Sequence, residues 1–491
     1  MLFNSYEFIF LFLPITFSIY FWLNTKRLTQ ASKGWLIFAS FFFYSWWNII
    51  YLPLILGSIL FNFTVGSSIS KMEGHQFSRK KGISRKALLV FGVASNLLLL
   101  GYFKYMDFFI SNANIFLNTH LELMAIILPL GISFFTFTQI AYLVDAYRDE
   151  VQEMDYLNYT LFVTFFPHLL AGPILHHKEM MPQFDALKNK VLNYKNISIG
   201  LFIFSIGLFK KVVIADTLAL SANAGFDTAQ TLNLIEAWVT SLSYTFQLYF
   251  DFSGYTDMAL GVALLFNIRL PINFNSPYKA LDIQDFWRRW HITLSRFLRD
   301  YIYIPLGGNR NGNLAMYSNL MITFILGGLW HGAGWTFIFW GGLHGAALVL
   351  HRFWKHLGLS MHNVIAWFIT FNFINITWIF FRAREWEDAL KVLHGMMGLN
   401  GIVLSEKLSA KVSFLSHYGV TFGEYFVNIE MTSKDLRFLT AVLFLTVVFK
   451  NTNQRAERFK PNWITLLFTA TIFIYTILNL EKVSEFLYFN F

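Results

Sequence analysis

His331 is the residue whose setting points most directly to chemistry. It lies in Gly327–Trp335, at the end of an apolar run that begins at Leu314, far from any acidic or basic neighbour. An ionisable side chain inside an apolar span is a functional candidate. The flanking glycines let another backbone, or a thin ligand, approach the imidazole closely. The alternative is a structural histidine that hydrogen-bonds to a neighbouring helix.

His291 lies in Asp282–Tyr303, a stretch that predicts one amphipathic helix. At about 100° per residue, its charged side chains share an arc of about 120°, opposite an arc of aromatic and aliphatic ones. The charged arc holds Asp285, Arg288, Arg289, Arg296, Arg299 and Asp300. One interpretation is an interfacial helix that binds anionic lipid. The other is that Arg288, Arg289 and Arg296 bind the phosphates of a cytoplasmic ligand whose reactive end meets His291.

Further candidates are weaker. His344 also has glycine neighbours, and Trp330 directly precedes His331. Asp251 and Asp257 lie in an apolar region, so we expect them either to line one cavity or to cap broken helices around Gly254.

No metal site is predicted. No carboxylate spacing accompanies the buried histidines, and the adjacent His176 and His177 are interpreted as a surface pair rather than as metal ligands.

Two buried histidines suit acyl transfer to a hydroxyl. Neutral imidazole can take the proton of the hydroxyl as its oxygen attacks an activated acyl group. The chain has no cysteine, so it cannot hold the acyl group as its own thioester. We therefore expect no bound cofactor, and a donor substrate such as acetyl-coenzyme A or another acyl thioester.

The elements that position these residues must be membrane helices. Of 491 residues, 55% are hydrophobic and only 14% are charged, against about 25% in soluble domains. The net charge of +9 is interpreted as a topology signal rather than as a sign of nucleic-acid binding.

The charge distribution predicts the orientation. Basic residues follow the first and third apolar runs, whereas residues 106–123 contain no Lys or Arg. The larger cluster comprises Lys71, Arg79, Lys80, Lys81, Arg85 and Lys86. The positive-inside rule then places the N-terminus outside the cytoplasm and segment 269–312 on the cytoplasmic side.

The predicted fold is an all-α polytopic membrane bundle of roughly eleven or twelve spans, on windows of about 20 residues. Leu157–Leu175 is interrupted by Pro167, Gly172 and Pro173 and predicts a re-entrant segment. Gly254–Phe266 is expected either to dip into the membrane and return or to continue the preceding helix. Without repeats or linkers, residues 1–491 are treated as one domain.

Five motifs together resemble the membrane-bound O-acyltransferase family, within it the bacterial branch of the alginate and peptidoglycan O-acetylation membrane proteins. They are Phe250–Met258, Asn273–Tyr278, Phe286–Ser295, Tyr301–Arg310 and Leu329–Gly332. The segments Met1–Ser5, Leu170–Ile174 and Phe380–Ala383 extend the resemblance over nearly the whole chain.

The resemblance implies a helical bundle around a central tunnel in the bacterial inner membrane. His291 and His331 match the two family histidines, and His331 matches the presumed catalytic one. It further implies a cytoplasmic acyl donor, surrounding membrane lipid and a periplasmic acyltransferase or esterase-like partner, which places the acetyl group on a polysaccharide hydroxyl.

Alternatives remain at this point. D-alanyl transfer to teichoic acid would use the same fold, a transporter or flippase would use the histidines to gate protons, and a scaffold would need neither histidine. Alginate, peptidoglycan and cellulose all remain candidate acceptors. The many Phe, Ile, Asn and Lys codons indicate an AT-rich genome, which favours peptidoglycan over alginate.

Overall fold

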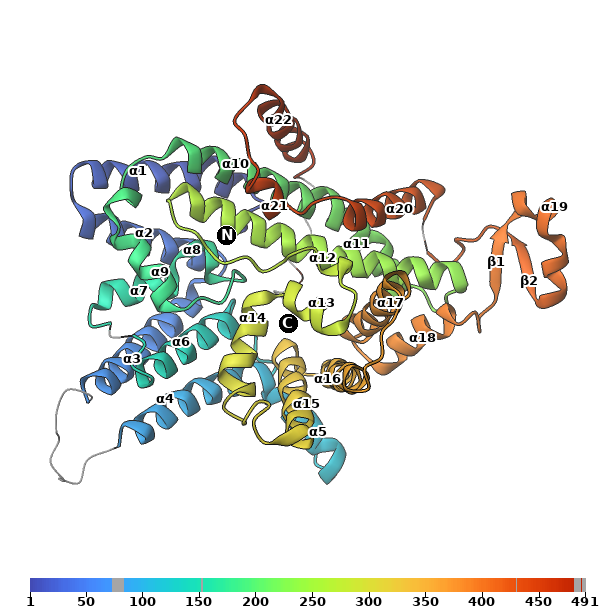
Figure 1. The fold of residues 1–491 in the computed structure, drawn as a ribbon, viewed down its shortest axis with the longest axis horizontal. Coiled ribbons are helices and arrows are strands. Elements are labelled where there is room, and N and C mark those ends of the chain that lie inside the picture. Colours follow the sequence, from blue (N-terminus) through green and yellow to red (C-terminus); the bar gives the residue numbers. More distant parts are fainter. Residues whose placement is uncertain (73–83, 152, 430, 481–486, 488–491) are drawn as a thin grey trace. The chain divides into compact units, whose positions relative to one another are not determined.

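The computed structural model describes residues 1–72, 84–151, 153–429, 431–480 and 487 (Figure 1). Helices dominate it, and the strands of the described residues form a single two-stranded sheet. The predicted all-α polytopic class is confirmed. Arg79, Lys80 and Lys81 of the predicted basic cluster lie outside the described residues.

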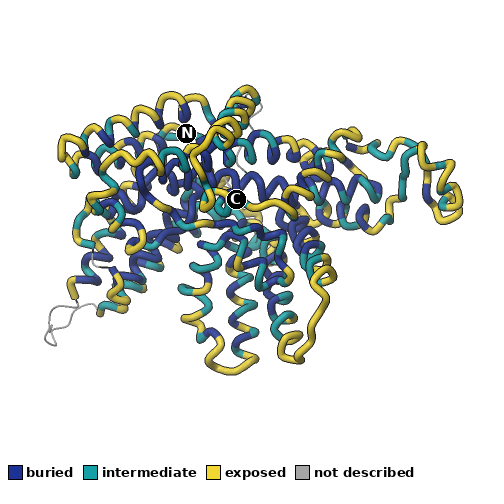
Figure 2. Tube along the Cα trace, turned by 45° about the horizontal axis from the view of Figure 1, so that its top comes forward, coloured by how far each residue is buried: buried dark blue, intermediate teal, exposed yellow. Residues whose placement is uncertain are grey.

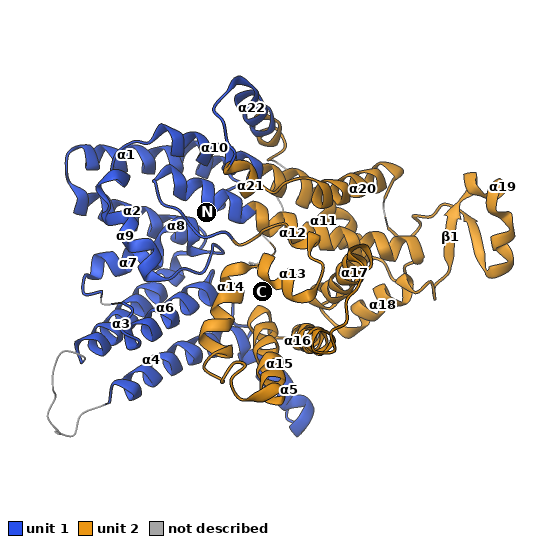
Figure 3. Cartoon of the chain, in the orientation of Figure 1, with its two compact units in different colours: residues 1–207, 255–272, 458–473 blue, residues 208–254, 273–457, 474–491 orange. Residues whose placement is uncertain are grey.

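The chain forms two compact units (Figure 3). The first contains residues 1–207, 255–272 and 458–473, and the second contains residues 208–254, 273–457 and 474–491. Three helices pass from one unit to the other: α10 (Tyr194–Phe209), α12 (Leu234–Leu265) and α22 (Trp463–Ile477).

The first unit is a helical bundle. Its helices are α1 (Leu13–Thr25), α2 (Thr29–Ser45), α3 (Leu52–Lys71), α4 (Arg85–Leu100), α5 (Met106–Leu117), α6 (Ile132–Tyr147), α7 (Tyr156–Thr164), α8 (Phe166–Leu169), α9 (His177–Asp185) and most of α10 (Tyr194–Phe209). Short 3₁₀ and π turns comprise Glu7–Phe12, Ile49–Tyr51, Gly101–Tyr105 and Leu187–Asn189.

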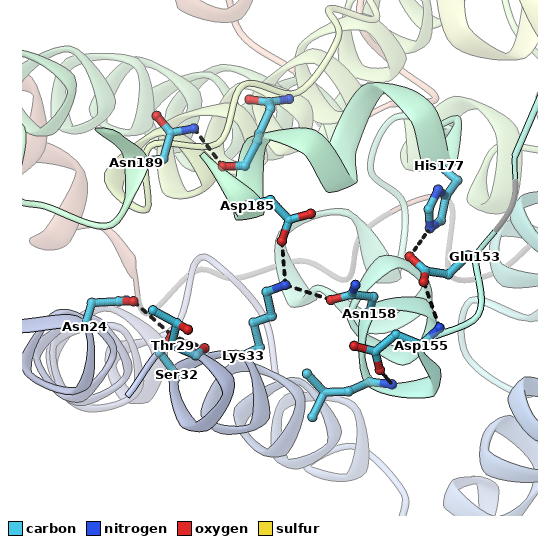
Figure 4. Close-up of polar contacts among 12 residues, drawn as sticks. Asn24, Thr29, Ser32, Lys33, Glu153, Asp155, Asn158, His177, Asp185 and Asn189 are labelled. Carbon is cyan, nitrogen blue, oxygen red and sulfur yellow. Dashed lines mark hydrogen bonds and ion pairs between the residues drawn. The ribbon is translucent and has the colours of Figure 1, made fainter. Parts of the chain in front are cut away.

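Ion pairs tie the basic segments of this unit to acidic ones. Arg85 pairs with Asp149, and the buried Lys33 donates to Asp185 and Asn158, each at 2.7 Å (Figure 4). The first contact joins the start of α4 to the end of α6, and the second joins α2 to α7 and α9. The predicted orientation in the membrane stays a prediction.

The predicted interruption near Pro167 is present. Helix α7 ends at Thr164, α8 lasts one turn, and an irregular buried segment runs to α9. Irregular backbone of this kind is stable at membrane depth only when protein surrounds it.

The second unit contains most of the remaining elements. They are α11 (Asp216–Asn223), much of α12 (Leu234–Leu265), α13 (Ile283–Arg289), α14 (Ile292–Leu298), α15 (Gly312–His331), α16 (Trp335–His356), α17 (Asn363–Arg382), α18 (Trp386–Met396), α19 (Ser409–Val412), α20 (Ser433–Val448) and α21 (Thr452–Ala456). Its turns comprise Lys210–Ala215, Ala224–Thr228, Pro277–Lys279, Arg299–Tyr303, Glu406–Leu408 and Ser413–Tyr418. Strands β1 (Ile402–Ser405) and β2 (Val420–Gly423) pair in parallel, with Ile402 opposite Val420.

Helix α12 is continuous through Gly254. The chain therefore continues the preceding helix, and no broken helix exists there for Asp251 or Asp257 to cap. Residues of α12 are buried along most of its length, whereas those of α22 (Trp463–Ile477) are mostly exposed (Figure 2).

Six helical segments of the described chain are long and apolar enough to cross a membrane. They are Glu7–Thr25, Ile49–Lys71, Arg85–Leu117, Tyr194–Thr228, Gly312–His331 and Asn363–Arg382, and the apolar α22 is shorter. The protein is therefore polytopic, while the count of eleven or twelve spans stays a prediction.

Candidate active site

Helices α15 and α16 of the second unit approach each other through glycine. A Cβ atom on Gly328 would lie 2.3 Å from the carbonyl oxygen of Phe337, and one on Gly341 would lie 2.3 Å from that of Phe324. The two backbones are thus in direct contact, as small residues allow between membrane helices. Gly328, three residues before His331, therefore serves close backbone approach, whereas a Cβ atom on Gly332 would meet the ring of Phe337.

His331 is the last residue of α15 and is only 3% exposed. Aromatic rings surround it: the centroid distances are 4.9 Å to Trp330, 5.2 Å to Trp340 and 5.1 Å to Phe381. The imidazole thus sits within a water-poor aromatic enclosure at a helix end. This is the ionisable group in an apolar span that the sequence predicted.

His291 is also fully buried, but the single helix predicted over Asp282–Tyr303 is wrong. Helix α13 ends at Arg289, Trp290 is extended, and His291 adopts a left-handed conformation with φ 42° before α14 begins. A non-glycine residue rarely adopts this conformation, so surrounding contacts must hold it.

The segment that follows α12 provides those contacts. The carbonyl of Asn273 accepts from the N–H of Ile292 at 3.0 Å, and its side-chain oxygen accepts from the N–H and hydroxyl of Thr293 at 3.1 and 2.7 Å. On the other side of the break, the N–H of Asn275 donates to the carbonyl of Arg289 at 2.9 Å. These bonds satisfy backbone groups that the interrupted helix releases.

The ring of His291 faces α12 and α15. Its centroid lies 4.8 Å from that of Phe252 and 6.2 Å from that of Trp330. Trp330 therefore contacts both candidate catalytic histidines. Burial lowers the pKa of His291 to about 3, so its imidazole is neutral at physiological pH.

The predicted arginines do not form one helix face, because the break separates α13 from α14. Arg288 is exposed on α13, Arg289 pairs with Asp285 at 2.9 Å, and Arg296 is half-buried on α14. Their role in donor binding stays a prediction.

His344 lies on α16 with no exposed surface. Its Nδ1 accepts a hydrogen bond from Nε1 of Trp287 at 3.2 Å. Its ring centroid lies 4.7 Å from that of Trp340, which also contacts His331. The structure thus brings His344 close to His331, because the indole of Trp340 contacts both.

Asp251 belongs to a buried charge cluster that the sequence did not predict. Nζ of Lys211 lies 2.7 Å from Asp251 and 2.8 Å from Asp216, and all three side chains are at least 93% buried. The sequence held a signal for this cluster, because Lys211 is an ionisable residue within the long apolar segment Tyr194–Thr228.

Asp257 is buried farther along α12, in the first unit. Six residues of an α-helix rotate it about 120° away from Asp251, so the two carboxylates face different sides of α12.

Metal ligation finds no support in the described part of the chain, where no group of three His, Cys, Asp or Glu side chains could hold an ion. The prediction of a surface pair is wrong. His176 bonds to Asp145 at 3.0 Å and His177 to Glu153 at 3.1 Å, and both imidazoles are at least 88% buried.

Sequence reasoning also missed Trp287, Trp340 and Asn273. Tryptophan is expected to be buried in any such bundle, so nothing distinguished Trp287 and Trp340. The motif Asn273–Tyr278 supports the family resemblance, but the sequence does not reveal that Asn273 bonds to Ile292 and Thr293, because these contacts arise from tertiary structure.

Known proteins resemble this chain, two of them over its full length. A peptidoglycan O-acetyltransferase of Helicobacter pylori is 49% identical over all of this chain and 98% of its own length. A probable alginate O-acetylase AlgI of Pseudomonas putida is 37% identical over the full length of both. A teichoic acid D-alanyltransferase of Streptococcus thermophilus is 28% identical over 51% of this chain and 68% of its own.

Residues 17–384, which include His291, His331 and His344, match the model of the MBOAT family. Together with the relatives that match over their full length, this match shows the class of enzyme. The chain belongs to the membrane-bound O-acyltransferase family and is a membrane O-acyltransferase.

Proposed function

We propose that the protein transfers an acetyl group from a cytoplasmic thioester donor across the inner membrane for O-acetylation of peptidoglycan, with His331 as general base. The observation that carries the proposal is the burial of His331 at the end of α15 within the rings of Trp330, Trp340 and Phe381. The full-length peptidoglycan relative at 49% identity supports this acceptor over alginate.

The reaction needs little beyond a positioned base. Neutral His331 accepts the hydroxyl proton as the oxygen attacks the thioester carbonyl, the new C–O bond forms, and the C–S bond breaks. The imidazolium then returns the proton to the leaving thiolate, so that an ester and a free thiol result. The aromatic enclosure protects the thioester, because it keeps competing water away.

The attacking hydroxyl belongs either to the polymer or to a periplasmic partner of the acyltransferase or esterase-like class. His291 supports the donor end, and Arg288, Arg289 and Arg296 bind the donor phosphates. The donor is acetyl-coenzyme A or another acyl thioester, because the chain lacks a thiol of its own.

Two alternatives have less support. The D-alanyltransferase relative is less similar and matches only about half of this chain. Membership of an acyltransferase family argues against a transporter or a scaffold without acyl chemistry.

The test uses the purified chain in vesicles with labelled acetyl-coenzyme A and peptidoglycan fragments. We expect acceptor-dependent release of free coenzyme A by the wild type and by His356→Ala, a control at the exposed end of α16. His331→Ala is expected to release none. Equal release by His331→Ala would overturn the proposal. So would a wild type that consumes no thioester even after periplasmic extract is added to supply a partner hydroxyl.

A further inference from the structure

A cavity lies wholly within the first unit. Its volume is about 560 Å³, within the range of small-molecule sites. The end of α9, the beginning of α10 and the segment after α12 form its walls. Its lining includes Gln183, Lys188, Asn193, Lys195, Asn196, Asn267 and Arg269.

Hydrogen bonds fix the cavity walls. The side-chain amide of Asn267 donates to the carbonyls of Asn189 and Val191 at 3.0 and 2.8 Å, and its oxygen accepts from Asn196 at 2.9 Å. Gln183 bonds to both backbone groups of Arg269, at 2.8 and 3.1 Å. The three chain segments are thus locked together before any ligand arrives.

The charge of the lining is entirely positive. Lys188, Lys195 and Arg269 have exposed side chains, and within the described residues none of them pairs with a carboxylate. The carboxylate of Asp185, next to the lining residue Ala186, pairs with Lys33 (Figure 4).

The N-terminus of α10 adds to this field. The side chain of Asn193 accepts from the N–H of Asn196 at 3.1 Å and so caps the helix at the cavity wall. The first turn of a helix carries a partial positive charge and favours anions.

We propose that this cavity binds a phosphate-bearing ligand. Two ammonium groups, one guanidinium and a helix N-terminus suit a phosphate, which offers several acceptor oxygens. Ile199 and Pro182 supply an apolar wall for the rest of the ligand. The phosphate comes from an anionic lipid headgroup or from a soluble phosphate compound. The inference does not depend on the acyl transfer proposed above.

The experiment uses the purified full-length chain in uncharged detergent. One arm titrates it with adenosine 3′,5′-bisphosphate by calorimetry. The other arm reconstitutes it with equal phosphatidylglycerol and phosphatidylcholine and counts the retained lipids by native mass spectrometry. The test variant is Lys188→Gln/Lys195→Gln/Arg269→Gln. The matched control is Lys26→Gln/Lys71→Gln/Lys86→Gln, which removes the same charge from exposed positions of the same unit.

We expect the test variant either to bind adenosine 3′,5′-bisphosphate on the order of tenfold more weakly or to lose its retained phosphatidylglycerol. The control variant is expected to keep both. Loss in the first arm identifies a soluble compound, and loss in the second identifies a lipid headgroup. Should the test variant misfold, Arg269→Gln and Lys188→Gln alone are each expected to weaken binding in part. Binding in neither arm, or equal loss in the control, would overturn the proposal.

Discussion

The indole of Trp287 donates a hydrogen bond to Nδ1 of His344 over 3.2 Å, from α13 to α16. An Nδ1 that accepts leaves the proton of neutral His344 on Nε2, so this bond fixes the tautomer. Because Trp340 lies against both His344 and His331, the bond also sets one wall of the enclosure around His331.

Replacing Trp287 by Phe keeps an aromatic ring but removes the donor. We expect Trp287→Phe to lose about 1–2 kcal/mol of stability, because a buried nitrogen loses its partner. Thermal unfolding in detergent, together with thiol release, measures the effect. Trp354→Phe, at an exposed position of α16, serves as the control. An unchanged unfolding temperature in Trp287→Phe would contradict a structural role for the bond.

The glycine contact between α15 and α16 allows a paired test. Gly328→Ala places a methyl group 2.3 Å from a backbone oxygen, which cannot move without separating the helices. We expect a loss of roughly 1–3 kcal/mol and a marked fall in activity. A Cβ at Gly342, one position beyond Gly341, meets nothing within 4 Å, so Gly342→Ala should behave as wild type. Equal behaviour of the two variants would refute the backbone contact.

Lys211 forms ion pairs with two buried carboxylates. Lys211→Met should therefore destabilise the protein by roughly 3–5 kcal/mol, because Asp216 and Asp251 are left without their cation. Adding Asp251→Asn should recover part of this loss. The unfolding temperatures of the wild type, the two single variants and the double variant form a double-mutant cycle that measures this recovery. If Lys211→Met and Asp251→Asn alone each leave the unfolding temperature unchanged, the ion pairs do not stabilise the fold.

The low pKa of His291 predicts an acid-dependent stability. The unfolded imidazole takes up a proton below about pH 6.5, whereas the folded one stays neutral down to about pH 3. The unfolded state therefore binds more protons in this window, and the contribution of His291 to stability is lost as the pH falls.

The comparison is wild type against His291→Asn, since asparagine tolerates the left-handed backbone. Unfolding temperatures between about pH 4 and pH 8 should fall more steeply on acidification for the wild type. Parallel curves would show that His291 does not titrate as its burial implies.

The sequence predicted what depends on composition and local pattern. Low charge and long apolar runs predicted the membrane class, and a lone histidine between glycines predicted the buried His331. Pro167 predicted the interruption after α7.

The remaining features depend on contacts between distant segments. The break at His291 exists because Asn273 and Asn275 bond to backbone groups on either side of it, which no helical periodicity reveals. Lys211 and Asp251 are 40 positions apart in the sequence and become partners only through packing. The cavity beside α10 likewise forms only because the segment that contains Arg269 packs beside the segment that contains Lys188.

His331 is proposed as the general base of the acetyl transfer that ends in acetate esters on the peptidoglycan. The most direct measurement is the ester-linked acetate released by mild base from the peptidoglycan of cells that carry only a chosen variant, at equal membrane levels. We expect His331→Gln to fall to the level of a strain without the protein, while His356→Gln retains the wild-type amount. A wild-type amount of acetate in the His331→Gln strain would contradict the account.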